Sequence, residues 1–140
     1  MSLALRILGT PAGQGSAKAY VVGGRARITN SNPKHKAWRT DVVEQTTTQL
    51  PADWQRYEQP VEVFLWFFQE PPKTLTKAAR AFPPDRGIDI DKLARAVLDA
   101  LTIAGVWDDD KRVTSLHAVK HWADERHPQG ARIVVEAVRA

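Results

Sequence analysis

The sequence has no cysteine among its 140 residues. Disulfides, thiolate metal sites and cysteine nucleophiles are therefore excluded, and a reducing, cytoplasmic setting fits. No apolar run approaches the roughly 20 residues of a membrane span, and the apolar start is too short and too alternating for a secretion signal. No repeat of roughly 20–50 residues is visible, which argues against solenoids and propellers. The length predicts one domain over residues 1–140.

Acidic residues are also missing from residues 1–40, although the same stretch is rich in basic ones: Arg6, Lys18, Arg25, Arg27, Lys34, Lys36 and Arg39. Residues 71–86 add Lys73, Lys77, Arg80 and Arg86. Basic surface of this kind indicates a polyanionic partner such as DNA. Residues 85–110 instead carry a group of acids: Asp85, Asp89, Asp91, Asp99, Asp108, Asp109 and Asp110. These acids would repel phosphate unless a divalent metal lay between them.

Hydrophobic patterning predicts an α/β (α+β) domain, with a mixed sheet and two main helices packed on it. One helix starts at Asn32-Pro33 and runs to about Leu50, and the other covers residues 91–104 with Gly105 as its C-cap. Strands are expected at residues 3–8, 60–69, 113–121 and 131–138, with a hairpin at residues 20–28.

Three finer expectations concern packing. The aromatic strand at 60–69 reads as central and buried on most of both faces, with Trp66 in the core. The turn at 127–130 is expected to join the last two strands as a hairpin. Residues 71–86 read as a surface excursion with one or two helical turns. Residues 9–18 lack the spacing of a nucleotide-binding loop, so no nucleotide cofactor is expected.

The Asp-x-Asp pair, Asp89 and Asp91, lies at the start of the second helix. On an extended backbone two such side chains share one face, about 7 Å apart at their Cα atoms. Carboxylate oxygens suit Mg²⁺ or Mn²⁺, which bind phosphate oxygens through their remaining positions. Such an ion would activate water and neutralise charge at a phosphodiester.

A structural interpretation of the same acids stays open. Acids at a helix start interact favourably with the helix dipole, and Asp91 is a plausible N-cap. The run at 108–110 is equally a solvated turn after Gly105. The helix between the two acidic groups is about 20 Å long, so both ends reach one metal only if the chain doubles back.

The string GIDIDKLARAVLDALTIAGVWDDDKRVTSLHAVK, residues 87–120, resembles the RusA family of Holliday-junction resolvases. The family pattern is an Asp-x-Asp-Asn-Leu-x-Lys segment, an Asp-Ala-Leu helix, Gly-x-Trp-x-Asp-Asp, and a hydrophobic strand with a lysine near its end. The resemblance implies a RusA-like fold and a homodimeric endodeoxyribonuclease that depends on Mg²⁺ or Mn²⁺. The resemblance further implies that such an enzyme cuts four-way DNA junctions by paired symmetric nicks in recombination and repair, in bacteria or phage-infected cells.

The resemblance also implies residue roles. Asp89, Asp91 and Asp110 match the catalytic metal ligands, with Asp109 beside them, and Lys120 matches the late lysine. Two positions depart from the family pattern: Lys92 stands where the family has Asn, and Arg95 stands where it has Lys. Arginine keeps the charge but does not deprotonate at neutral pH, so we expect Arg95 to stabilise phosphate. DNA contacts are expected from the remaining cations: Lys18, Arg25, Arg27, Lys34, Lys36, Arg39, Lys73, Lys77, Arg80 and Lys92.

Other hypotheses remain at this point. The substitutions Lys92 and Arg95 favour a non-catalytic protein that binds branched DNA with the same fold. A nuclease acting on flaps, forks or single strands is a further option. A small-molecule enzyme has the least support, since no cofactor motif is present. The histidines 35, 117, 121 and 127 lack helical metal-ligand spacing and read as phosphate contacts or structural residues.

Overall fold

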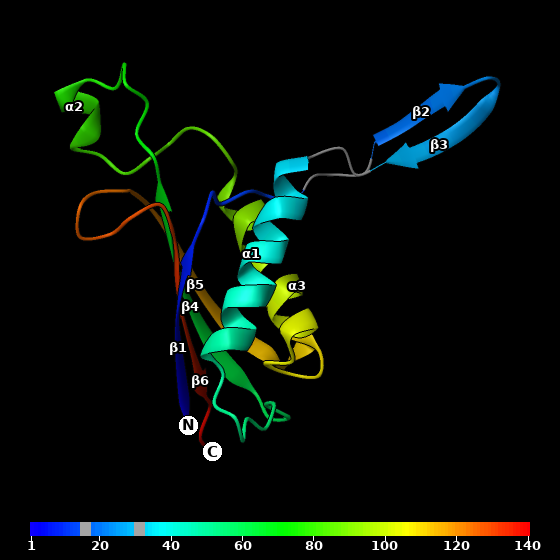
Figure 1. Cartoon of the computed structure of the whole chain (residues 1–140), viewed down its shortest axis with the longest axis vertical. Helices are drawn as coiled ribbons and strands as arrows, with labels where there is room; N and C mark the ends of the chain where they lie inside the picture. Colours follow the sequence, from blue (N-terminus) through cyan, green and yellow to red (C-terminus); the bar gives the residue numbers. More distant parts are fainter. Residues whose placement is uncertain (15–17, 30–32) are drawn as a thin grey trace.

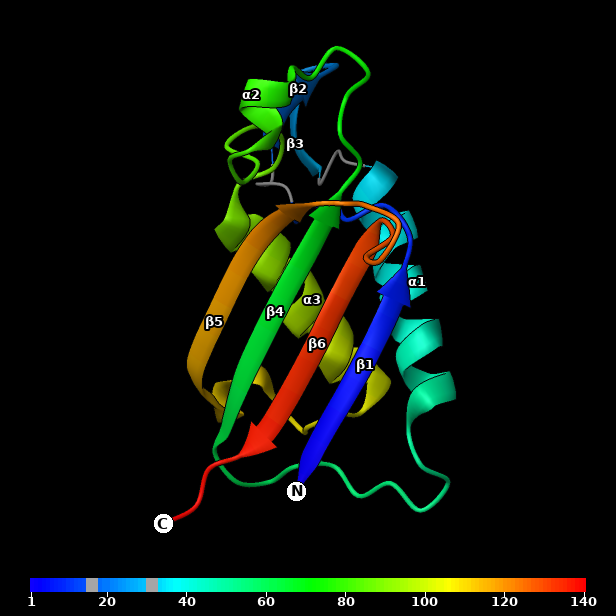
Figure 2. The same ribbon diagram turned by 90° about the vertical axis from the view of Figure 1, so that its left-hand side faces the viewer.

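A four-stranded sheet forms the centre of the computed structural model, which describes residues 1–14, 18–29 and 33–140. The strands are β1 (Ser2–Leu8), β4 (Val61–Gln69), β5 (Val113–Trp122) and β6 (Gly130–Ala137), in the order β1-β6-β4-β5 (Figure 2). The pair β4–β5 is parallel, whereas β6 runs antiparallel to both β1 and β4. The sheet is therefore mixed, as the sequence predicts.

Two long helices cover one face of this sheet and leave the other open (Figures 1 and 2). They are α1 (Pro33–Gln49) and α3 (Ile90–Ala104). Shorter elements are α2 (Lys77–Arg80), the 3₁₀ turn η1 (Asp110–Arg112), and a separate hairpin of β2 (Lys18–Val22) and β3 (Arg25–Thr29). The predicted α+β class with two main helices is confirmed, and so are the hairpin and the single helical turn in the excursion.

The core lies between the sheet and the helices. The β4 residues Val61, Val63, Leu65 and Phe67 are fully buried there, against α3 residues such as Leu93, Val97 and Leu101. The alternate β4 residues are only half-buried, because no helix covers their face. The expectation of a strand buried on both faces is therefore wrong, although its central position is confirmed. Trp66 lies on the open face beneath Arg132 rather than in the core.

The last two strands do not form the predicted hairpin. β4 lies between β5 and β6, so the loop after β5 crosses the end of β4 before β6 returns. The Ala123 amide donates to the Gln69 carbonyl at 2.7 Å, which holds this crossing in place. The sequence turn at 127–130 gives no information on which strand lies next to which, since the pairing is decided by contacts distant in sequence.

Helix α3 begins one residue earlier than predicted and ends at the predicted position. Asp89 is its N-cap, so Asp91 belongs to the first turn and the N-cap hypothesis for Asp91 is wrong. Gly105 caps the other end in the left-handed conformation, with φ of 83°. The start of α1 matches Pro33, while Asn32 lies outside the described residues. Within the described chain, no helix has the length and apolarity to cross a membrane.

Candidate active site

A cleft lies where the start of α3 meets the end of β5, both at the upper end of the molecule in Figure 1. Its lining comes from three segments: Pro83 and Pro84 of the excursion, Asp89, Ile90 and Asp91 at the helix start, and Ala118, Val119, Lys120 and His121 of β5. Residues about 30 positions apart in sequence are thus brought together. Three residues that the sequence selected, Asp89, Asp91 and Lys120, share this cleft.

The two acids of the Asp-x-Asp pair have different backbone settings. Asp89 is extended, with φ of −60° and ψ of 138°, and Asp91 lies within the helix. An N-cap aspartate usually accepts a hydrogen bond from a backbone N–H in the first turn of its helix. The Asp89 carboxylate makes no such bond. It instead pairs with Lys92 at 3.5 Å, and the Asp89 side chain stays 68% exposed. The Asp89 carboxylate is therefore available to a ligand from the cleft.

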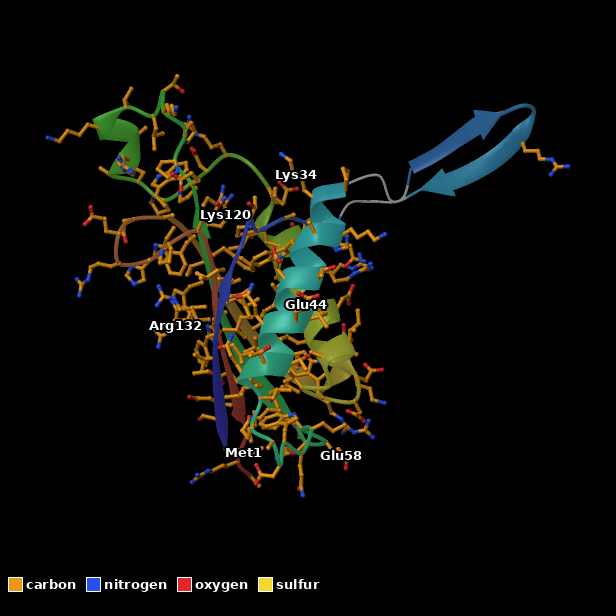
Figure 3. The ribbon with its side chains drawn as sticks, in the orientation of Figure 1. Met1, Lys34, Glu44, Glu58, Lys120 and Arg132 are labelled. Carbon is orange, nitrogen blue, oxygen red and sulfur yellow. The ribbon has the colours of Figure 1, made fainter. Side chains whose placement is uncertain are left out.

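Lys120 is held in place by the backbone of the segment that leads into α3. Its ammonium donates to the Ile88 carbonyl at 3.0 Å and to the Arg86 carbonyl at 3.3 Å. An ammonium has three N–H donors, so one remains for an anion after these two bonds. The same bonds tie β5 to the residues just before Asp89, and Figure 3 shows Lys120 at this end of the sheet. Lys120 thus both positions the Asp-x-Asp segment and places a positive charge beside it.

The three aspartates at 108–110 have different partners and surroundings. Asp108 forms a two-point ion pair with Arg112, with both N–O distances 2.8 Å, and this pairing lowers the pKa of Asp108. Asp109 caps η1 by accepting the Lys111 amide at 2.8 Å. Burial raises the pKa of Asp110, and the charges of Asp109 and Asp99 raise it further against the opposing effect of Arg95.

Asp110 therefore lies beside the middle of α3, within electrostatic reach of Asp99 and Arg95. Neither Asp110 nor Arg95 is among the residues that line the cleft. Among the described residues, no group of three or more acidic or histidine side chains is placed to hold a metal ion. Within one chain, Asp89 and Asp91 therefore lie in the same cleft as Lys120, whereas Asp110 is not among the residues that line it.

The family comparison covers the segments that form the cleft. Residues 9–136 match the family model described as endodeoxyribonuclease RusA. The chain belongs to the RusA family. No individually curated protein sequence matches it significantly. Family membership identifies the chain as an endodeoxyribonuclease, a hydrolase that acts on Holliday junctions.

The predicted DNA contacts of this RusA-family chain gather at the same end as the cleft. The hairpin β2–β3, the start of α1, the helix α2 and the start of α3 all lie there in Figure 1. They carry Arg25, then Lys34, Lys36 and Arg39, then Lys73, Lys77 and Arg80 in and before α2, and Lys92. The side chains of Lys18 and Arg27 lie outside the described part. This end of the molecule therefore combines the cleft with basic groups suited to phosphate.

Sequence reasoning did not select one feature of this RusA-family cleft, its proline wall. Pro83 and Pro84 form one wall, and the Trp122 indole holds that segment by donating to the Phe82 carbonyl at 3.0 Å. His121 lines the cleft as well and stacks on Phe68, with ring centroids 5.9 Å apart. The paired prolines mark a rigid segment in the sequence, but their place in the same cleft as Asp91 depends on tertiary contacts.

Proposed function

We propose that the chain is a metal-dependent homodimer that resolves four-way DNA junctions by paired symmetric nicks, in recombination and repair. The cleft that unites Asp89, Asp91 and Lys120 carries the proposal, because it places two carboxylates and an ammonium together at the basic end. Carboxylates alone would repel DNA, and cations alone would bind it without hydrolysis. Their combination is what a phosphodiester hydrolase needs.

The donor set fits a hard divalent cation. Asp89 and Asp91 offer exposed carboxylate oxygens, and Mg²⁺ commonly binds proteins through one or two carboxylates while keeping waters and phosphate oxygens. Mn²⁺ accepts the same ligands. When bound, such an ion supplies an activated water and neutralises charge on the phosphate. Asp109 is a weaker candidate for a metal ligand, because its carboxylate already caps η1.

The chain's cations have separate roles in this proposal. Lys120 uses its remaining N–H to bind the scissile phosphate, and its two carbonyl contacts fix where that N–H lies. Arg95, one helical turn beyond Asp91, binds a phosphate as a bidentate donor. The basic groups of the hairpin, α1 and α2 hold the junction arms.

Asp110 is the third acid, and we assign it to the active site of the partner subunit. Within one chain it lies beside Arg95 and Asp99, and the described residues form no three-acid group. A junction is close to two-fold symmetric and needs two opposed cuts, which a two-fold dimer matches with two sites. In such a dimer each site could take its Asp-x-Asp pair from one subunit and Asp110 from the other.

Mixed dimers test this assignment. We expect Asp91→Asn and Asp110→Asn each to abolish cleavage as homodimers, and co-refolded mixtures of the two to recover single nicks. One site of the mixed dimer would then combine intact Asp91 with intact Asp110, while the other site would lack both. If Asp110 acts within its own chain, both sites carry one defect and no nicking returns. Asp108→Asn is unsuitable as a control, because Asp108 holds Arg112.

The activity itself is tested on a labelled mobile four-way junction, with linear duplex, flap and fork substrates as controls. We expect paired nicks in the junction only, dependent on Mg²⁺ or Mn²⁺ and lost in Asp91→Asn. Faster cleavage of flaps or forks would instead identify a nuclease for other branched DNA.

The ion pair between Lys92 and Asp89 favours one alternative, a non-catalytic binder of branched DNA, since Lys92 competes with metal for Asp89. An exposed pair contributes about 0.2–1 kcal/mol. Lys92→Asn should therefore lower the Mg²⁺ concentration for half-maximal cleavage by a factor of about 1.5 to 5. Lys36→Asn, at a cation of α1, is the control and should leave this concentration unchanged. Tight junction binding without cleavage, in both the wild type and Lys92→Asn, would establish the alternative.

A further inference from the structure

The open face of the sheet carries a row of aromatic side chains. Phe64, Trp66 and Phe68 alternate along β4 on the face that neither long helix covers, and all three are half-buried. Flat side chains of the neighbouring strands lie against them: His117 stacks on Phe64 with ring centroids 4.8 Å apart, and the Arg132 guanidinium lies 5.3 Å from the Trp66 ring centre. Figure 3 shows Arg132 on the side of the sheet away from α1. Aromatic rings exposed in this way on a sheet are suited to stacking.

A hollow of about 600 Å³ opens on this face. Trp66, Phe68 and Arg132 line it from the sheet, while Arg80 and Phe82 line it from the excursion. Phe82 is 70% exposed, an unusual position for a phenylalanine that has no ligand to contact. The size falls within the range of roughly 300–1,000 Å³ that is usual for small-ligand sites. The hollow therefore has the dimensions of a binding site, and we call it the open-face hollow.

The charge of the open-face hollow suits a phosphate. Within the part of the chain that the structure describes, neither Arg80 nor Arg132 forms an ion pair. Asp124 is the one acid among the described lining residues, and its carboxylate already accepts the backbone amides of Arg126 and His127. Guanidinium groups bind phosphate and also stack on flat rings. The hollow thus fits a ligand that is both planar and anionic, which is the chemistry of a nucleotide.

The open-face hollow adjoins the active-site cleft. Pro83 and His121 line both, so they form a shared wall between the two. Hydrogen bonds hold this wall at the end of the sheet: the Trp122 indole donates to the Phe82 carbonyl at 3.0 Å, next to Pro83. A DNA strand with a phosphate beside Lys120 would enter the hollow on crossing this wall.

We propose that the open-face hollow holds unpaired nucleotides of the DNA strand that is cut, with a base stacked on its rings and phosphates bound by Arg80 and Arg132. The proposal rests on the proposed function in one respect, since it takes the strand in the hollow to be the strand held in the cleft. In a duplex, neighbouring bases cover both faces of each base, so a stacking site selects bases that a branch point has released. The rings of Phe68 and His127 are nearly parallel, at 11° and 4.9 Å, and a flat base can extend their stack.

Binding of a short fluorescent oligothymidylate, measured by anisotropy without metal, tests the proposal. Phe68→Leu should weaken this binding by a factor of about 5 to 100, because a base loses its aromatic platform. Phe64→Leu is the matched control. Phe64 lies on the same strand and face and also stacks on a histidine of β5, but it does not line the hollow. This control should bind as the wild type does.

A second variant separates binding from folding. Phe82→Ala removes a side chain that is 70% exposed and keeps the backbone carbonyl that accepts from Trp122. We expect an unchanged circular dichroism spectrum and an affinity for oligothymidylate reduced by a factor of about 5 or more. Ile103→Ala, at an apolar residue of α3 that is 61% exposed, is its control and should leave the affinity unchanged.

The outcomes divide clearly. No binding by the wild type, wild-type affinity in Phe68→Leu or Phe82→Ala, or an equal loss in Phe64→Leu would overturn the proposal. Thymidine monophosphate that competes with the oligonucleotide at equal affinity would overturn it as well, since the hollow would then be a site for free nucleotides. Oligonucleotide binding that depends on Phe68 and Phe82, in a chain that cuts no junction, would count against the nuclease function alone, because the assay involves neither metal nor cleavage.

Discussion

At the residue scale, Asp124 shows a carboxylate used purely for structure. It follows β5 and accepts the backbone amides of His127 at 2.7 Å and Arg126 at 2.9 Å, which closes the loop that crosses the end of β4. The hydrogen bond from the His127 backbone amide is the main reason that the pKa of Asp124 is lowered. The loop therefore depends on a charge that acid removes.

We expect the stability contributed by Asp124 to be lost in acid. Because folding lowers the pKa of Asp124, its contribution is full above the ordinary aspartate value of about 3.9 and declines as the pH falls through the folded-state value. Asp124→Ala should lower Tm at pH 7, and the difference from the wild type should shrink at pH values below the folded-state pKa.

Asp124→Asn is the control, because an amide oxygen still accepts both backbone N–H groups but does not titrate in this range. Thermal melts from pH 7 downward compare the three proteins. A Tm difference for Asp124→Ala that is constant across the whole pH range would show that the charge has no part in closing the loop.

The acids near the active site also differ in whether the fold uses their carboxylates, as it uses that of Asp124. Asp108 is committed to Arg112 at 2.8 Å and Asp109 to the Lys111 amide, whereas the Asp89 carboxylate makes no capping hydrogen bond and only a longer contact of 3.5 Å with Lys92. Carboxylates that the fold does not use are the better candidates for catalysis. The sequence alone does not make this distinction, because three consecutive aspartates look alike until their backbone partners are known.

At the element scale, the amphipathic helix α3 was predicted to within one residue because its signals are local. Its apolar stripe and Gly105 lie within residues 90–105 and require no knowledge of the sheet. The neighbour of β6 was predicted wrongly, since strand order depends on contacts distant in sequence. The open face of β4 was missed for a related reason: the aromatic run predicts burial, but only the fold shows that both helices lie on the same side.

Two glycines at element boundaries should respond differently to substitution. At Gly105 the φ of 83° disfavours a side chain, but a Cβ would meet nothing within 4 Å. Gly105→Ala should therefore cost about 1 kcal/mol of unfolding free energy, from the backbone alone. At Gly130, φ is 150° and a Cβ would collide with the Ile7 carbonyl of β1. Gly130→Ala should cost about 3 kcal/mol or more, because the β1–β6 pairing must shift.

Urea denaturation of both variants measures these costs. The comparison is internally controlled, since the substitution is the same and only the surroundings differ. Equal losses at the two positions would contradict the close approach of β1 and β6 at Gly130.

At the scale of the whole molecule, the basic groups and the cleft share one end, and the chain termini lie at the other (Figure 1). Lys34 and Lys120 mark the basic end in Figure 3, and Met1 and Glu58 mark the opposite one. The fold thus collects cations from four separate segments, which the sequence shows only as a basic first half and a basic excursion. The hairpin β2–β3 extends furthest from the sheet, so it is suited to reach a DNA arm away from the cleft.

This arrangement predicts how junction binding depends on salt. Each phosphate contact that is removed reduces the slope of log K against log salt by about 1. Arg25→Ala, at an exposed hairpin residue, should therefore weaken junction binding and flatten the slope by about 1. Arg139→Ala removes the same charge near the C-terminus, at the far end, and should leave the slope unchanged. Binding titrations at several salt concentrations, in Ca²⁺ to prevent cleavage, separate the two. Equal slopes for both variants would mean that net charge, rather than the basic end, governs the contact with DNA.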